Sequence, residues 1–118
     1  MNEADLMRLI QIRASELGAR LFRNNVALAW VGHPCIRQPN GDVLVKNARP
    51  LHAGLCVGSS DLIGFTKTGR FLAVEIKIGD GRLSAEQKTF IEVVKKNSGI
   101  AGPAWSVEDF EKLLEESN

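Results

Sequence analysis

The stretch LIGFTKTGRFLAVEIKI, residues 62–78, decides the fold of this 118-residue chain. Its two ends, Leu62 to Phe65 and Arg70 to Ile78, are rich in the aliphatic and aromatic residues that favour strands. Between them, Thr66-Lys67-Thr68-Gly69 is a short connection that contains glycine, as β-hairpins often do. The stretch therefore predicts a hairpin at the centre of the domain.

Three amphipathic helices are predicted around this hairpin, because apolar residues recur there every three to four positions. The first covers Glu3 to Leu17 and has Asn2 as its N-cap. The second begins at the capping box Ser84-Ala85-Glu86-Gln87. The third begins after Ser106, which is also a good N-cap.

Further strands are predicted on both sides of the hairpin. Arg20 to Arg23 reads as a short strand and Val26 to Val31 as another apolar segment. An irregular hairpin is expected between Gly32 and Pro50, with a turn at Pro39-Asn40-Gly41. Pro103 interrupts the weak strand from residue 100 to 105, which suits the edge of a sheet.

The order helix, strands, central hairpin, helix, strand, helix predicts a mixed α/β fold, a sheet flanked by helices. At this length, residues 1–118 are expected to form one domain. A composition of 44% hydrophobic and 25% charged residues is that of an ordinary globular protein. The longest apolar run, Val26 to Val31, is far shorter than the ~20 residues that cross a bilayer, so no membrane span is expected.

The N-terminal sequence lacks the basic start and apolar run of a secretory signal, which favours a cytoplasmic location. Cys35 and Cys56 stand alone and are expected to be reduced thiols. The net charge of +1 conceals an asymmetry: residues 106–118 hold one Lys against five Asp and Glu. The remainder is mildly basic, which suits local contact with phosphates.

Two carboxylates are brought together by the predicted hairpin. Strand alternation puts Glu75 and Lys77 on one face. The short connection leaves two registers open, in which Asp61 faces either Val74 or Glu75. Opposed side chains on one face lie ~5 Å apart, where two carboxylates repel unless a cation sits between them. A hard divalent cation fits that gap.

Lys77 would then be placed to hold or deprotonate a water, or to meet negative charge that develops on a phosphate. The alternative is structural: Asp61 caps a strand, and Glu75 and Lys77 form a surface ion pair. The apolar neighbours Phe71 to Val74 argue against it, because a lone Glu in a buried strand needs a partner.

Three segments carry a resemblance to a known family: GSSDLIGF (58–65), FLAVEIK (71–77) and GRLSAEQKTF (81–90). Together they resemble the core of the VRR-NUC family, within the PD-(D/E)XK nuclease superfamily, and the proline that precedes the Asp there is Ser60 here. The resemblance implies a restriction-endonuclease-like fold. It also implies a Mg²⁺- or Mn²⁺-dependent endonuclease acting on branched or structured DNA, such as Holliday junctions or flaps.

The resemblance assigns roles to individual residues. Asp61 and Glu75 would hold the metal together with the backbone carbonyl of Ile76, and Lys77 would be catalytic. Glu3 matches an acid that reaches the metal directly or through water; otherwise it complements the helix dipole. Gln87 matches a catalytic position at the mouth of the site, and its alternative role is in the capping box; the two roles can coexist.

Charge or size suggests a place for several other residues. Five cations are candidates for phosphate contact, although a single such residue is more often a solvated surface charge: Arg20, Arg23, Lys67, Arg70 and Arg82. Trp30 and Trp105 are expected in the core in preference to a base-stacking role.

Two other functions compete with a nuclease. One is a catalytically silent nucleic-acid-binding module, against which the complete acid, acid, Lys set argues. The other is a partner-interaction protein that uses the acidic last helix, which shows no more than ordinary amphipathicity. For a nuclease, symmetric cleavage of a junction needs two sites, so a homodimer is expected.

Overall fold

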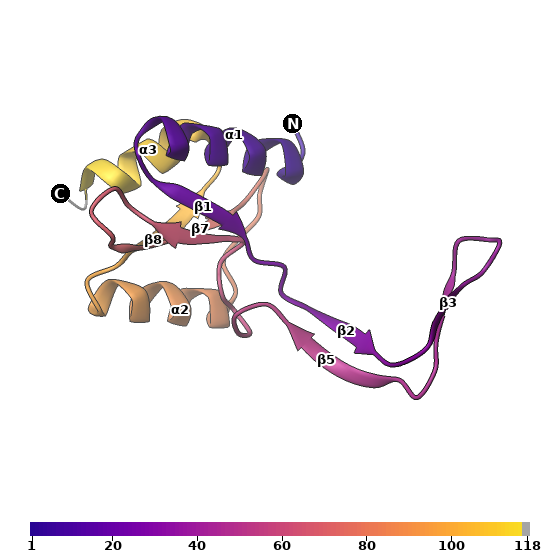
Figure 1. Cartoon of the computed structure of the whole chain (residues 1–118). Coiled ribbons are helices and arrows are strands. Elements are labelled where there is room, and N and C mark those ends of the chain that lie inside the picture. Colours follow the sequence, from indigo (N-terminus) through magenta and orange to yellow (C-terminus); the bar gives the residue numbers. More distant parts are fainter. Residues whose placement is uncertain (117–118) are drawn as a thin grey trace.

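Strand β7 (Phe71–Ile76) is the centre of the fold, because five of its six residues are buried. The computed structural model describes residues 1–116 and places β7 in a four-stranded sheet of order β1-β6-β7-β8 (Figure 1). β1 (Arg20–Arg23) and β6 (Leu62–Phe65) run antiparallel, as do β6 and β7, whereas β8 (Ile100–Ala104) runs parallel to β7. The sheet is therefore mixed, consistent with the predicted restriction-endonuclease-like fold.

Helices cover both faces of this sheet, and the alternation of β7 decides which side chain meets which helix. Leu72, Val74 and Ile76 point into the larger core, where α1 (Glu3–Glu16) and α3 (Val107–Glu116) pack. Ala73 points to the opposite face, which α2 (Ala85–Lys96) covers. No helix within residues 1–116 has both the length and the apolarity to cross a membrane.

The predicted helix starts are confirmed by their caps. Asn2 accepts from the backbone N–H of Asp5 at 2.8 Å, and both bonds of the Ser84 and Gln87 capping box are present. Ser106 accepts from the N–H of Asp109 at 3.1 Å. Pro103 lies in β8, which pairs with β7 alone among the described strands and so forms an edge that tolerates proline.

The central hairpin adopts the second of the two registers considered above. Phe65 pairs with Phe71 and Leu62 pairs with Val74. Continuing this register by one residue places Asp61 opposite Glu75, so the register that would set Asp61 against Val74 is wrong. Thr66 and Arg70 close the turn, because the N–H of Thr66 donates to the carbonyl of Arg70 at 2.9 Å.

A two-stranded projection, residues 25–55, leaves the body of the molecule and is called the arm below (Figure 1). β2 (Ala27–Val31) pairs with β5 (Arg49–Ala53), and farther out β3 (Cys35–Arg37) pairs with β4 (Val43–Val45). The arm makes the molecule 50 Å long and 30 Å wide. The radius of gyration of the whole molecule, 16.6 Å, exceeds the ~13.5 Å of a compact chain of this length.

The outer hairpin of the arm confirms the predicted turn at residues 39–41, but β5 and its pairing with β2 were not predicted. The core positions predicted for the two tryptophans are wrong. Trp30 is 58% exposed because it lies on the arm, and Trp105 is 43% exposed at the end of β8. The large apolar area of a Trp side chain therefore did not predict burial for either residue.

Candidate active site

Asp61 and Glu75 lie at the end of the sheet from which the arm leaves. Asp61 directly precedes β6, and Glu75 is the penultimate residue of β7. The first turn of α2 reaches the same place, because the side-chain N–H of Gln87 donates to Oε1 of Glu75 at 3.2 Å. The antiparallel pairing of two strands and the start of one helix thus create a polar corner beside a buried sheet.

Asp61 is held from two sides. Its Oδ2 accepts from the backbone N–H of Ile76 at 2.9 Å, across the hairpin. Its backbone carbonyl accepts from the N–H of Asn24 at 2.8 Å. The carboxylate is therefore oriented by backbone groups and needs no flexible side chain to position it.

Glu75 is an acid in a buried strand, 3% exposed. Its Oε2 is buried and has no hydrogen-bond partner among the described residues. The pKa of Glu75 is raised to about 8, mainly by burial and further by hydrogen bonding to the adjacent Asp61 carboxylate and by its charge. The charge of Lys77 acts in the opposite direction and that of Glu3 in the same direction as Asp61, but both effects are smaller. An unpartnered carboxylate oxygen beside a second carboxylate is a site that favours a proton or a cation.

The carboxylates of Asp61 and Glu75 and the nearby backbone carbonyl of Ile76 fit a hard divalent cation, because carboxylate and carbonyl oxygens are the ligands that such ions prefer. Within residues 1–116, however, no three Asp, Glu, His or Cys side chains converge closely enough to hold a metal. Glu3 acts on Glu75 through its charge, and its exposed side chain is not placed with the pair as a third ligand.

Lys77 follows β7 and continues its pairing, since its N–H donates to the carbonyl of Ala104 at 3.0 Å. Its side chain is partly exposed and its charge lowers the pKa of Glu75, so the ammonium group acts on this buried acid. Gly81 leaves room for the aliphatic stem: a Cβ there would lie 3.3 Å from Cδ of Lys77. The acid, acid, Lys set predicted from the sequence is thus brought together.

The five candidate phosphate contacts divide between the two ends of the sheet. Arg23 pairs with Leu62, and Arg82 lies in the loop that joins β7 to α2, so both are near the acid pair. The other three lie at the far end, around the hairpin turn. There Arg20 donates to Oγ of Ser15 at 2.9 Å and Arg70 donates to the carbonyl of Ser98 at 2.9 Å, with Lys67 in the turn itself.

Asn24 belongs to this region and was missed in the sequence. Its amide donates to Oγ of Ser59 at 2.7 Å and to the carbonyl of Ser60 at 2.8 Å, and its Oδ1 accepts from the N–H of Leu55 at 2.9 Å. It therefore joins both roots of the arm to the turn that precedes Asp61. An Asn after a short strand looks like an ordinary turn residue, so no local signal marks it.

The VRR-NUC domain matches residues 33–107, more than half of the chain. The chain belongs to the VRR-NUC family. This membership makes it a nuclease domain, of a family that generally uses divalent metals and acts on DNA. A comparison with individual curated proteins gave no match.

The VRR-NUC match contains Asp61, Glu75, Lys77 and Gln87, whereas Glu3 lies outside it. Gln87 combines the two roles that the sequence left open. Its Oε1 accepts from the N–H of Ser84 at 2.9 Å, within the capping box, while its Nε2 donates to Glu75. One side chain thus caps the start of α2 and orients the buried acid.

Substitution of Gln87 should separate these roles. Gln87→Glu keeps the oxygen that accepts from Ser84 but places a third carboxylate against Glu75 in place of a donor. We expect nuclease activity to fall about 10- to 100-fold, the effect of losing a hydrogen bond to a charged group. The matched variant Ser84→Ala should cost about 1 kcal/mol of stability and keep the activity. Both are checked by cleavage rates and thermal unfolding; normal cleavage by Gln87→Glu would make the position structural only.

Proposed function

We propose that this VRR-NUC domain is a divalent-metal-dependent endonuclease that hydrolyses phosphodiester bonds in branched or structured DNA, such as Holliday junctions or flaps. The observation that supports it best is the buried, unpartnered Oε2 of Glu75 beside Asp61. Two facing carboxyl groups can both ionise only when a cation lies between them, and otherwise one of them keeps a proton. A catalytically silent nucleic-acid-binding module would have no use for them.

In this proposal Asp61, Glu75 and the backbone carbonyl of Ile76 hold Mg²⁺ or Mn²⁺, and Glu3 contributes through water. When bound, such a cation polarises the phosphate and makes a water a better nucleophile. Lys77 holds the attacking water in line with the phosphorus and meets the negative charge that develops on the phosphate oxygens. Gln87 keeps Glu75 in position through the hydrogen bond from Nε2.

The cations near the acid pair, Arg23 and Arg82, are proposed to contact the DNA backbone, because such contacts need charge and no base-specific geometry. Lys67, Arg20 and Arg70, at the other end of the sheet, would contact a more distant part of a branched substrate. Symmetric cleavage of a junction needs two active sites, so the functional unit is proposed to be a homodimer.

A panel of end-labelled DNA substrates tests this function: junction, flap, nicked duplex, plain duplex and single strand. Each is incubated with Mg²⁺, with Mn²⁺ and with excess chelator. We expect cleavage of the branched substrates that needs metal and returns when metal is added after the chelator. Undiminished cleavage in chelator contradicts the metal requirement, and cleavage of plain duplex alone contradicts the substrate class.

A further inference from the structure

A shallow groove runs along the free edge of β1, between this strand and α1. Its volume is about 430 Å³. β1 is an edge of the four-stranded sheet, because among the described strands it pairs with β6 alone. One face of α1, at positions 8, 11, 12 and 15, forms the opposite wall. This face lies beside the buried stripe of α1 and leaves Ile12 52% exposed, so the groove offers an uncovered apolar surface.

The groove is also positively charged. Its lining contains Arg8 and Arg20, and no Asp or Glu within residues 1–116 contributes to it. Neither arginine forms an ion pair with another described residue. Arg20 donates to Oγ of Ser15 at 2.9 Å, which holds its guanidinium at the groove and leaves its other donors for a ligand. Two arginines without a carboxylate suit the phosphates of a nucleic acid.

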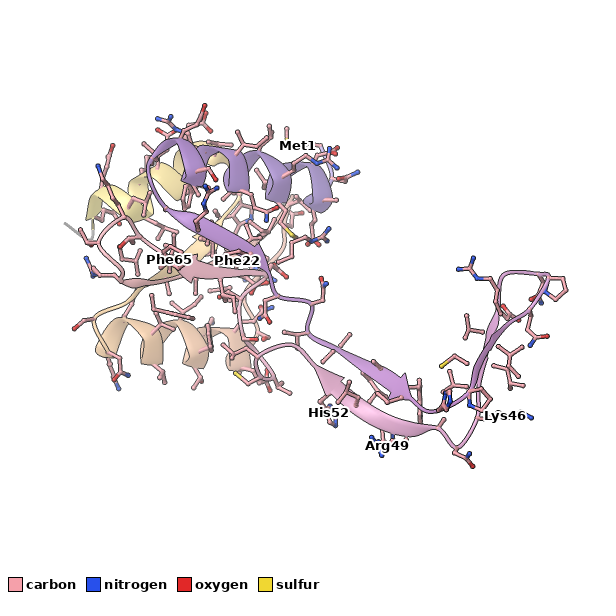
Figure 2. All side chains as sticks on the ribbon, viewed as in Figure 1. Met1, Phe22, Lys46, Arg49, His52 and Phe65 are labelled. Atoms are coloured by element: carbon pink, nitrogen blue, oxygen red, sulfur yellow. The ribbon has the colours of Figure 1, made fainter. Side chains whose placement is uncertain are left out.

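Two exposed phenylalanines lie beside the groove, on β1 and on the neighbouring strand. Phe22 is part of the groove lining and is 56% exposed, and Phe65 on β6 is 45% exposed. Their ring centroids lie 6.3 Å apart, with 49° between the ring planes. Leu21 points into the larger core, so strand alternation directs Phe22 to the opposite face, where the buried residues beneath α2 belong to β7 and β8. The two rings are therefore left open, between α1 and α2 in Figure 2.

A single strand of DNA suits this edge better than a peptide or a duplex does. Single strands bind where cations that contact phosphates lie beside aromatic rings on which bases stack. A peptide at a sheet edge usually adds a strand, but the carbonyl of Leu21 in β1 already accepts from Nε2 of Gln11 at 3.1 Å. The bases of a duplex are stacked on one another and cannot cover the two rings. The ligand must therefore be unpaired.

We propose that the β1 edge binds an unpaired DNA strand, with its phosphates at Arg8 and Arg20 and its bases stacked on Phe22 and Phe65. In taking DNA as the ligand, this site rests on the proposed function. It also narrows that function, because a substrate that fills both the β1 edge and the acid pair must contain an unpaired segment, as a flap does.

The direction of β1 connects this edge to the acid pair. Phe22 is followed by Arg23, which pairs with Leu62, the residue after Asp61. The other wall leads the same way, because α1 begins at Glu3, whose charge acts on Glu75. A strand bound along β1 therefore approaches the acid pair from the hairpin-turn end of the sheet.

The affinity for fluorescein-labelled oligo(dT) of about 10 nucleotides tests the site, measured by anisotropy in excess chelator so that binding is separated from metal-dependent cleavage. Phe22→Leu keeps an apolar side chain but removes the ring, so the affinity should fall about 5- to 100-fold with an unchanged salt dependence. Arg8→Gln should instead reduce the slope of log affinity against log salt by about 0.7, the loss of one phosphate contact to a single strand.

Two matched variants control for surface aromatic area and for charge. Trp105→Leu removes an aromatic side chain that is 43% exposed and directly follows β8, at the opposite edge of the sheet. Lys96→Gln removes an exposed cation at the end of α2. Neither variant should change the affinity for oligo(dT) or its salt dependence.

Phe22→Trp tests base stacking directly, because it keeps an aromatic ring and adds a fluorescent one. In a background of Trp30→Phe and Trp105→Phe, the introduced indole is the only one in the chain. Oligo(dT) should bind this variant at least as tightly as the wild type and should quench the indole fluorescence as bases stack on it. A signal that does not change at saturating oligo(dT) would mean that no base reaches this position.

The outcomes separate this site from the nuclease function. A wild type that does not bind oligo(dT), or an affinity that Phe22→Leu leaves unchanged, overturns the site even if the protein cleaves branched DNA. A Phe22→Leu variant that changes the oligomeric state and not the affinity makes this edge a protein interface, which also overturns the site. An affinity that falls with Phe22→Leu and is kept with Phe22→Trp supports the site even if no DNA is cleaved.

Discussion

The Lys77→Ala variant should cleave DNA about 100- to 10,000-fold more slowly than the wild type in single turnover, the range for a group that moves a proton or stabilises charge in the transition state. Its DNA affinity, measured in Ca²⁺ as a cation that often supports binding without cleavage, should be unchanged. The reason is that Asp61 is oriented by the N–H of Ile76 and Glu75 by Gln87, so neither acid depends on Lys77 for its position.

Lys77→Arg is the control for charge alone, and it should not restore the rate. A guanidinium is planar, larger and retains its proton, whereas this position needs a compact ammonium. Since the charge of Lys77 lowers the pKa of Glu75, the rates are compared at several values of pH up to about 9. A defect that disappears at high pH would mean that Lys77 only keeps Glu75 ionised. A loss of DNA affinity in proportion to rate would make Lys77 a phosphate anchor.

The Glu75→Gln variant should lose cleavage about 1,000-fold or more and yet gain stability when metal is absent. The amide keeps an oxygen to accept from Gln87 but cannot act as an anionic metal ligand. In the wild type the folded pKa of Glu75 is about 8, against an ordinary value of 4.5. Between these two pH values the native state therefore keeps a proton that the unfolded chain has released. The stabilisation of the native state that is fully present below pH 4.5 is lost as the pH rises through about 8.

Thermal unfolding in chelator from pH 5 to 9 measures this effect. The wild type should lose stability as pH rises and Glu75→Gln should not, so the variant should be the more stable protein at the upper end. Added Mg²⁺ or Mn²⁺ should stabilise the wild type and release a proton, and should leave Glu75→Gln almost unchanged. Asp80→Asn, an exposed acid in the following loop, is the matched control. A wild-type stability that does not change with pH would contradict the account of Glu75.

Local patterns predicted most of the body of the molecule, because its elements are specified by residues close in sequence. The caps at Asn2, Ser84 and Ser106 confirm the predicted helix starts. The hairpin 62–76 was expected from its apolar runs, but the length of its loop left the register open by one residue. That one residue decides whether Asp61 faces Glu75, and only the observed pairing chooses between the two.

The arm and its root could not be predicted, since both depend on contacts distant in sequence. The strand RPLHA, β5, has a proline and a histidine where a strand pattern should alternate, and its residues pair with residues of β2 that are 18 to 26 positions away. Trp30 was expected in the core because no local pattern tells whether a segment packs on the body. The side-chain hydrogen bonds of Asn24 join positions 31 to 36 residues apart, so the sequence near it gave no indication of them.

The hydrogen bonds of Asn24 affect which changes of sequence and length the segment 25–55 can accept. By fastening Leu55 to the turn before Asp61, Asn24 fixes the two points at which residues 25–55 leave and re-enter the body. Doubling the length of a flexible segment between fixed ends costs only about 0.6 kcal/mol of closure entropy. The segment between these two points can therefore be lengthened, shortened or replaced by a different ribbon. Such an exchange alters the arm while the backbone contacts that orient Asp61 stay as they are.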